Sequence, residues 1–252
     1  MQVHEFIEGK KPIMILIHGV LTPWQIWMPQ IEAFQEKYNV YVIALSAHTE
    51  EYASEFVSVI SETEKIEQYF LEQNIQTIDV LCGLSFGGII AHEIWKNGNL
   101  AICNLILDGA PLIPFPKIVE KIMTDNYLKI IHTSKARVPK TLESFKKQFL
   151  PEKYLNSYLK IADFMSDTSI INILHAVNTC NLCKNVNNRS RILFLYGTKG
   201  NEVLSKKAAR LMKKSYPETE LICFKGDSHC YKAIYEPEKW IEIVDAFLQK
   251  ES

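Results

Sequence analysis

The sequence has almost no net charge, because 28 Lys and Arg residues stand against 29 Asp and Glu residues and leave a formal charge of −1 over 252 residues. A chain this close to neutral has no overall field to hold a polyanion, which argues against a general nucleic-acid-binding protein. Long hydrophobic runs are also missing. The apolar stretch Ile13–Ile17 is far shorter than the ~20 residues that span a bilayer. We therefore expect neither a nucleic-acid partner nor a membrane partner.

The N-terminal segment lacks a basic stretch followed by an apolar one, so no secretory signal is expected. The six cysteines are scattered, and three of them lie in apolar runs, which favours reduced, mostly buried thiols in a cytoplasmic protein. Cys180 and Cys183 are spaced like half a zinc site, but no second Cys or His pair follows at zinc-finger spacing. We expect no metal and no other cofactor, and the sequence leaves the oligomeric state open.

Hydrophobic residues are plentiful at 47% and aromatic residues make up 11%, enough for a large core in one α/β domain. Short apolar runs alternate with segments of helical period. This alternation is typical of a mostly parallel central sheet with helices on both faces. The expected strands cover residues 13–17, 40–45, 78–82, 105–107, 192–196 and 221–224.

One stretch departs from this alternation. Between residues 111 and 189 there is no convincing core strand, and the stretch opens with Pro111, Pro114 and Pro116. We expect a helical cap or lid at residues 112–188, inserted in a core formed by residues 1–111 and 189–252. The alternative is a set of ordinary helices packed beside the sheet. Helical patterns lie around residues 118–131, 142–149, 154–164 and 170–177.

A glycine-serine-glycine motif lies between an expected strand and an expected helix, where residues 83–87 have the sequence Gly-Leu-Ser-Phe-Gly. Such a turn strains the serine backbone, and side chains two residues to either side would collide, which accounts for Gly83 and Gly87. The turn would lift the Ser85 hydroxyl above the sheet. The Phe86 N–H, at the helix start, could then donate to a developing oxyanion. The alternative is a glycine-rich turn that only links the two elements.

A second turn agrees with this interpretation. His18 and Gly19 follow the expected strand at residues 13–17. Acyl transfer needs a second backbone donor, and this turn could present the N–H of Val20 or its neighbour. We expect the His18 side chain itself to be a hydrogen-bonded core histidine.

A serine hydroxyl is a weak nucleophile and needs a base. Among the seven histidines, His229 lies in the Gly-Asp-Ser-His segment at residues 226–229, just after the expected strand at residues 221–224, which places it at the ligand-binding edge of a parallel sheet. It also follows the serine in chain order, as this arrangement requires. His92 lies along the helix after the serine and is a poor base. His132 and His175 fall in the expected cap, where we expect ordinary polar surface residues.

Taken together, these segments resemble proteins of the α/β-hydrolase fold over nearly the whole chain. Members are mostly esterases, lipases, thioesterases and other acyl hydrolases. A serine in this turn argues against haloalkane dehalogenases, which use aspartate there, and against the cysteine-dependent dienelactone hydrolases. The matching segments are residues 18–19, 83–88, 107–111 and 196–197, the helical insertion, and His229.

The acid that should orient the histidine is where the sequence departs from the family. The resemblance implies an acid about three residues past the glycine that ends the penultimate strand, and Gly200 occupies that position. Glu202 lies two residues further on and could reach the histidine. Asp108 is the second candidate, because some members place the acid after the strand that follows the serine's helix. A Ser–His dyad without an acid is the third possibility.

The resemblance implies a serine hydrolase that acts on a small, largely apolar acyl compound, either a carboxylic ester or a thioester. Ser85 would attack the acyl carbon, His229 would move the proton, and the N–H groups of Val20 and Phe86 would hold the oxyanion. Two alternatives stay open: acyl transfer to another acceptor at the same site, and ligand binding without turnover. The candidate substrate-contacting residues are Trp24, Leu21 and Leu112.

Overall fold

The computed structural model describes residues 1–186, 189–200 and 202–250. Within them, seven strands form one sheet in the order β1-β3-β2-β4-β5-β6-β7. β1 pairs antiparallel with β3, and every other neighbouring pair is parallel. The predicted α/β class with a mostly parallel sheet is confirmed. The strands are β1 (Gln2–Phe6), β2 (Ile13–Ile17), β3 (Asn39–Ala44), β4 (Thr77–Leu84), β5 (Ala101–Asp108), β6 (Arg191–Tyr196) and β7 (Glu220–Cys223).

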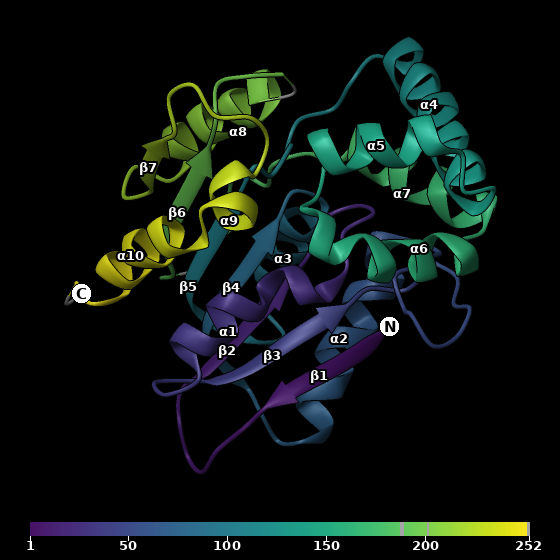
Figure 1. Ribbon diagram of the computed structural model, residues 1–252. Helices are drawn as coiled ribbons and strands as arrows, with labels where there is room; N and C mark the ends of the chain where they lie inside the picture. Colours follow the sequence, from purple (N-terminus) through teal and green to yellow (C-terminus); the bar gives the residue numbers. More distant parts are fainter. Residues whose placement is uncertain (187–188, 201, 251–252) are drawn as a thin grey trace.

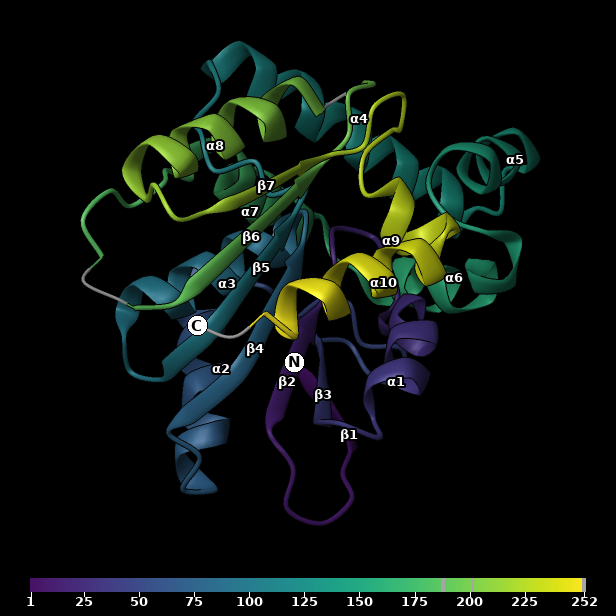
Figure 2. The same ribbon diagram turned by 90° about the vertical axis from the view of Figure 1, so that its left-hand side faces the viewer.

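Helices cover both faces of the sheet (Figure 2). On one face, α1 (Met28–Phe34) packs against α10 (Pro237–Leu248). On the other face lie α2 (Val59–Glu72), α3 (Phe86–Asn97) and α8 (Glu202–Ser215), and α2 packs against α3. Two short helices complete the core, the 3₁₀ helix η1 (Trp24–Trp27) before α1 and α9 (Tyr231–Tyr235) before α10.

The expected strands were found because the central strands are buried on both faces and therefore need continuous apolar runs. Residues 14–17 of β2 are at most 1% exposed, and β3 is buried along its whole length. β1 was not predicted. Its sequence Gln-Val-His-Glu-Phe is short and mostly polar, which suits an edge strand that is only partly covered.

Between β5 and β6 the described residues form helices and no strand, as predicted. We call α4 to α7 the inserted helices: α4 (Lys117–Lys135), α5 (Pro139–Gln148), α6 (Leu155–Phe164) and α7 (Asp167–Thr179), with the 3₁₀ helix η2 (Glu152–Tyr154) before α6. Figure 1 shows them gathered at the end of the sheet to which the parallel strands run. The predicted end of the cap at residue 188 lies outside the described residues.

Hydrogen bonds tie the inserted helices to one another and to the core. On exposed surface, His132 of α4 bonds Asp167 of α7 at 2.7 Å, and His175 of α7 bonds Glu120 of α4 at 2.7 Å. The Ser169 hydroxyl of α7 accepts the N–H of Phe56 at 3.0 Å, from the segment before α2. These bonds hold the inserted helices beside the C-terminal edge of the sheet. No helix among the described residues is long and apolar enough to cross a membrane.

Candidate active site

Ser85 occupies a strained turn between β4 and α3. Its backbone has φ 54° and ψ −112°, a conformation that non-glycine residues rarely adopt. Two backbone hydrogen bonds hold it there. The Ser85 N–H donates to the carbonyl of Asp108 at 2.7 Å, and the Gly88 N–H donates to the carbonyl of Ser85 at 2.9 Å. The surrounding sheet and helix therefore fix the serine at the end of β4.

Glycine is required on both sides of the serine, as the motif predicts. A Cβ atom on Gly83 would lie 2.2 Å from the carbonyl oxygen of Gly87, inside the same turn. A Cβ atom on Gly87 would lie 2.4 Å from the carbonyl oxygen of Ile17 at the end of β2. Both obstacles are backbone atoms, which cannot move aside as a side chain can.

Ser85, His229 and Glu202 form one hydrogen-bonded chain. Nε2 of His229 lies 2.8 Å from the Ser85 hydroxyl oxygen, and Nδ1 lies 2.5 Å from Oε1 of Glu202. Because a carboxylate only accepts, Nδ1 carries the proton, and Nε2 is left to accept from the serine hydroxyl. The Glu202 side chain is 0% exposed and the His229 side chain is 34% exposed. The carboxylate is therefore buried, whereas the imidazole is partly accessible to solvent.

Two glycines that follow strands make room for the histidine loop. A Cβ atom on Gly109, directly after β5, would lie 2.8 Å from Cε1 of His229. A Cβ atom on Gly197, directly after β6, would lie 2.5 Å from the carbonyl oxygen of Asp227. Their placement was not predicted, although both glycines belong to the strand exits that carried the family resemblance.

The structure separates the two acid candidates. The Asp108 side chain, at the end of β5, is buried, and its Oδ2 accepts the indole N–H of Trp240 at 3.0 Å. Asp108 makes no hydrogen bond to His229 among the described residues, because Glu202 occupies Nδ1. The expectation that Asp108 could orient the histidine is therefore corrected. Burial, with the nearby charge of Glu202, raises the pKa of Asp108 to about 7.

The two expected oxyanion donors belong to the residue that follows Ser85 and to a turn that approaches Ser85. Phe86 is the first residue of α3, so its N–H has no acceptor within the helix. Val20 follows Gly19, and a Cβ atom on Gly19 would lie 3.2 Å from Cβ of Ser85. In the part of the chain that the structure describes, neither the Val20 N–H nor the Phe86 N–H donates to a protein acceptor. Both donors therefore remain available to a substrate oxygen.

His18 is the buried, hydrogen-bonded histidine that the sequence predicts. Its Nε2 accepts the N–H of Leu45 at 3.1 Å, its Nδ1 lies 2.8 Å from the carbonyl oxygen of Gly19, and burial lowers its pKa to about 4. His48, which the sequence analysis did not single out, accepts the N–H of Leu21 at 3.0 Å. Nothing in the residue pattern around His48 indicates this contact, because it joins two turns that are far apart in the sequence.

The three candidate substrate-contacting residues, Trp24, Leu21 and Leu112, lie in different surroundings. The ring of Trp24 stacks on His4 of β1 with centroids 4.1 Å apart, and Phe6 of the same strand lies 6.1 Å away. The Trp24 ring thus packs on the edge strand β1, and its contact with a substrate stays a prediction. Leu21, at 3% exposed, lies in the turn beside Ser85, and Leu112, at 1%, lies in the loop that follows β5.

The other polar groups that the sequence singled out have structural partners. Nε2 of His92 accepts the N–H of Cys183 at 3.2 Å, away from the serine hydroxyl. The Cys180 thiol donates to the carbonyl of Pro111 at 2.8 Å, where the chain enters the inserted helices. His132 and His175 pair with carboxylates on exposed surface, as described above.

Only one group of three metal-ligating side chains lies close together in residues 1–186, 189–200 and 202–250: Glu202, His229 and Cys230. Glu202 and His229 are already bonded to each other. The thiol of Cys230 is buried and donates to the carbonyl of Asp108 at 3.6 Å, and burial raises its pKa well above its usual value. A protonated thiol is a poor metal ligand, so this donor set suits the hydrogen-bonded chain better than a metal ion.

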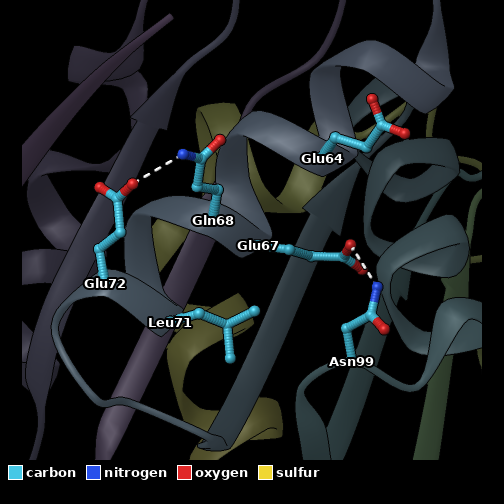
Figure 3. Close-up of a pocket in the computed structure, with 6 residues that line it drawn as sticks. All are labelled: Glu64, Glu67, Gln68, Leu71, Glu72 and Asn99. Atoms are coloured by element: carbon cyan, nitrogen blue, oxygen red, sulfur yellow. Dashed lines mark hydrogen bonds between the residues drawn. The ribbon is translucent and has the colours of Figure 1, made fainter.

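Two surface cavities are found, and one of them is lined in part by Glu202. One, of about 440 Å³, lies on α2 and is lined mostly by acidic and amide side chains; Figure 3 shows Glu67 turned toward Asn99, to which it bonds at 2.9 Å. The other, of about 230 Å³, lies along α8 beside Glu202. Neither is lined by Ser85 or His229. The candidate site is therefore defined by its side chains and not by these cavities.

No protein-family model matches the sequence, and no curated protein matches it. Solved structures match over nearly the whole chain. A protein assigned to the α/β-hydrolase family from Desulfitobacterium hafniense has a TM-score of 0.78 at 22% identity, covering 98% of this chain and 100% of that one. An enol-lactonase from Burkholderia xenovorans LB400 has a TM-score of 0.74 at 14% identity, covering 99% and 96%. An esterase from Exiguobacterium antarcticum has a TM-score of 0.70 at 18% identity, covering 98% and 95%.

These likenesses show the fold. The chain has the α/β-hydrolase fold that the sequence resemblance implied. At such low identities the chemistry has to be argued from the side chains of this chain.

Replacing Gly83 with alanine tests the packing of the serine turn. Because the new Cβ would lie 2.2 Å from a backbone oxygen, we expect Gly83→Ala to lower the free energy of unfolding by about 3 kcal/mol. Gly98→Ala is the matched control, since Gly98 has φ 72° and no atom within 4 Å of the new Cβ. Backbone strain alone should cost it about 1 kcal/mol. Chemical denaturation measures both, and equal losses would contradict the packing argument.

Asp108 should make stability depend on pH. Its pKa is raised from 3.8 to about 7 in the folded state, so the folded chain holds a proton that the unfolded chain has lost in this range. The free energy of unfolding then falls as pH rises from about 4 to 7. Asp108→Asn removes the titration and keeps an acceptor for Trp240. Urea denaturation measures the free energy of unfolding of both proteins. Relative to the parent, the free energy of unfolding of Asp108→Asn should be higher at pH 8 than at pH 5 by on the order of 2–3 kcal/mol. A pH-independent difference would contradict this.

Proposed function

We propose that this α/β-hydrolase-fold protein is a serine hydrolase that cleaves a small, largely apolar carboxylic ester or thioester through an acyl-enzyme intermediate. The observation that carries the proposal is the continuous hydrogen-bonded chain from the Ser85 hydroxyl through His229 to the buried carboxylate of Glu202. A nucleophile, a base and an orienting acid in this order are the recognised arrangement for acyl transfer by serine.

In the acylation step, Nε2 of His229 takes the hydroxyl proton while Oγ of Ser85 bonds to the acyl carbon. The carbonyl π electrons move onto oxygen, where the N–H groups of Val20 and Phe86 stabilise the negative charge. When the tetrahedral intermediate collapses, His229 gives the proton to the leaving alcohol or thiol. In the deacylation step, His229 takes a proton from water while the water oxygen attacks the acyl carbon of the acyl-enzyme. Collapse of this second intermediate releases the carboxylic acid, and His229 returns the proton to Oγ of Ser85.

Glu202 contributes by holding the imidazole in the Nδ1–H tautomer and by stabilising the imidazolium that forms in the transition state. Its complete burial strengthens this interaction, because little water competes for the carboxylate. Loss of the corresponding carboxylate in a serine protease costs about 10⁴ in kcat. The backbone donors are worth about 10²–10³ each in a comparable site.

The proposal extends to the inserted helices, which we assign as a cap at residues 112–188 over the C-terminal edge of the sheet. Two observations support this role. The inserted helices lie at the C-terminal end of the parallel strands, the end from which Ser85 follows β4, and the buried apolar residues Leu21 and Leu112 belong to the loops that follow β2 and β5. An apolar acyl chain held between cap and sheet would be shielded from water while the polar groups act on its carbonyl.

The solved structures that match this chain include two proteins described as an esterase and an enol-lactonase. Both names denote cleavage of an acyl–oxygen bond, which supports the reaction class. Acyl transfer to a different acceptor would use the same groups. Ligand binding without turnover is the alternative raised by Gly200 at the expected acid position, and the bond between Glu202 and His229 supports the enzyme instead.

Steady-state hydrolysis of p-nitrophenyl acetate and butyrate tests the proposal. We expect Ser85→Ala and His229→Ala to lower kcat by at least about 10³, since each removes a group that acts in the transition state. Full hydrolysis by Ser85→Ala would contradict the mechanism. Adding an alcohol or amine during the assay and analysing the products separates hydrolysis from acyl transfer.

The acid is tested by a matched pair of buried carboxylates. Glu202→Gln should lower kcat by about 10²–10⁴, because the amide cannot stabilise the imidazolium. Asp108→Asn should lower it by less than about tenfold, because Asp108 bonds Trp240 and not the histidine. The reverse order would show that Asp108 is the acid. Losses below about tenfold in both variants would favour a Ser–His dyad.

A further inference from the structure

His48 lies in the turn after β3, and its imidazole is completely buried. Its Nε2 accepts the N–H of Leu21 at 3.0 Å, and its Nδ1 lies 3.2 Å from the carbonyl oxygen of Ser46. A nitrogen that accepts a backbone N–H carries no proton, so Nδ1 is the donor and the ring is neutral. Burial and the neighbouring His18 ring both lower the pKa of His48, which keeps it in this form.

His18 makes the complementary contact in the opposite direction. It lies after β2 and accepts the N–H of Leu45, after β3, whereas His48 lies after β3 and accepts the N–H of Leu21, after β2. The centroids of the His18 and His48 rings are 4.8 Å apart. The pair therefore ties together the turns that follow two neighbouring parallel strands, at the sheet edge where Ser85 lies.

In the turn at residues 19–22, the N–H of Leu21 donates to His48, whereas the N–H of Val20 has no protein acceptor among the described residues. Leu21 has φ 57°, a left-handed conformation that costs a leucine free energy and persists only where surrounding contacts impose it. In this conformation the Leu21 N–H is directed at His48. The preceding N–H, that of Val20, has no protein acceptor among the described residues and belongs to the turn that packs against Ser85.

We propose that His48 is a positioning residue for oxyanion binding: its acceptor nitrogen holds the strained turn at residues 19–22 so that the Val20 N–H stays directed at the substrate oxygen. This inference rests on the proposed function. His48 makes no hydrogen bond to Ser85 or His229 in the described residues, so its effect on the oxyanion would pass through its bond to the backbone N–H of Leu21.

The test compares His48→Leu, which removes the acceptor, with His48→Gln, whose amide oxygen can accept the Leu21 N–H. In p-nitrophenyl butyrate hydrolysis, we expect His48→Leu to lower kcat by about 10–10³ with KM changed by less than about threefold, because the lost interaction exists only in the transition state. His48→Gln should recover at least a tenth of the parental kcat. Affinity for a trifluoromethyl ketone, which forms a tetrahedral oxyanion on the serine, should fall in parallel with kcat.

His92→Leu is the matched control, because His92 is also buried and also accepts a backbone N–H through Nε2, that of Cys183. It should lose stability without losing kcat or inhibitor affinity. Hydrogen exchange gives a readout that needs no turnover: the Leu21 amide should exchange slowly in the parent and in His48→Gln, and at least about tenfold faster in His48→Leu.

Equal exchange of the Leu21 amide in the parent and in His48→Leu would overturn the inference. A His48→Leu variant that keeps the parental kcat would overturn it as well. These outcomes are distinct from a failure of the proposed function. If the proposed function were wrong, Ser85→Ala would retain hydrolysis.

Discussion

The hydrogen bond between the Ser85 hydroxyl and Nε2 of His229 joins residues 144 positions apart in the sequence. It forms because parallel strands present their C-terminal ends at one edge of the sheet, so the residues that follow β4 and β7 meet there. The strained backbone of Ser85 brings its hydroxyl to this edge, and the glycine after β5 leaves space for the imidazole. The distance of 2.8 Å between Oγ of Ser85 and Nε2 of His229 therefore depends on the order of the strands, on the strained serine backbone and on close packing.

The polar groups of this edge form two sets. In the first set, His229 joins the Ser85 hydroxyl to the buried carboxylate of Glu202. The second set consists of buried side chains outside that chain: Asp108 accepts the indole N–H of Trp240, and His18 and His48 accept backbone N–H groups. Burial raises the pKa of Asp108 and lowers the pKa of both His18 and His48, so that the neutral forms of these three side chains are favoured.

The sequence predicted the sheet because its central strands are buried on both faces and show continuous apolar runs. It also predicted the serine turn, because Gly83 and Gly87 are demanded by local packing. The choice between Glu202 and Asp108 could not be made, since both follow strands at the same edge and only the path of the loop before α8 decides which carboxylate reaches the imidazole. The packing partner of Trp24 could not be predicted, because an apolar ring suits a substrate pocket and a strand face equally well.

The central claim is that Ser85 is a nucleophile activated by His229. Covalent labelling by a fluorophosphonate, followed by peptide mass spectrometry, tests it most directly, because the reagent reacts with an activated serine irrespective of the natural substrate. We expect a single phosphonylated residue, Ser85, in the parent, and labelling slowed by at least about 10³ in His229→Ala. A parent protein that leaves Ser85 unmodified, or an unchanged labelling rate in His229→Ala, would contradict it.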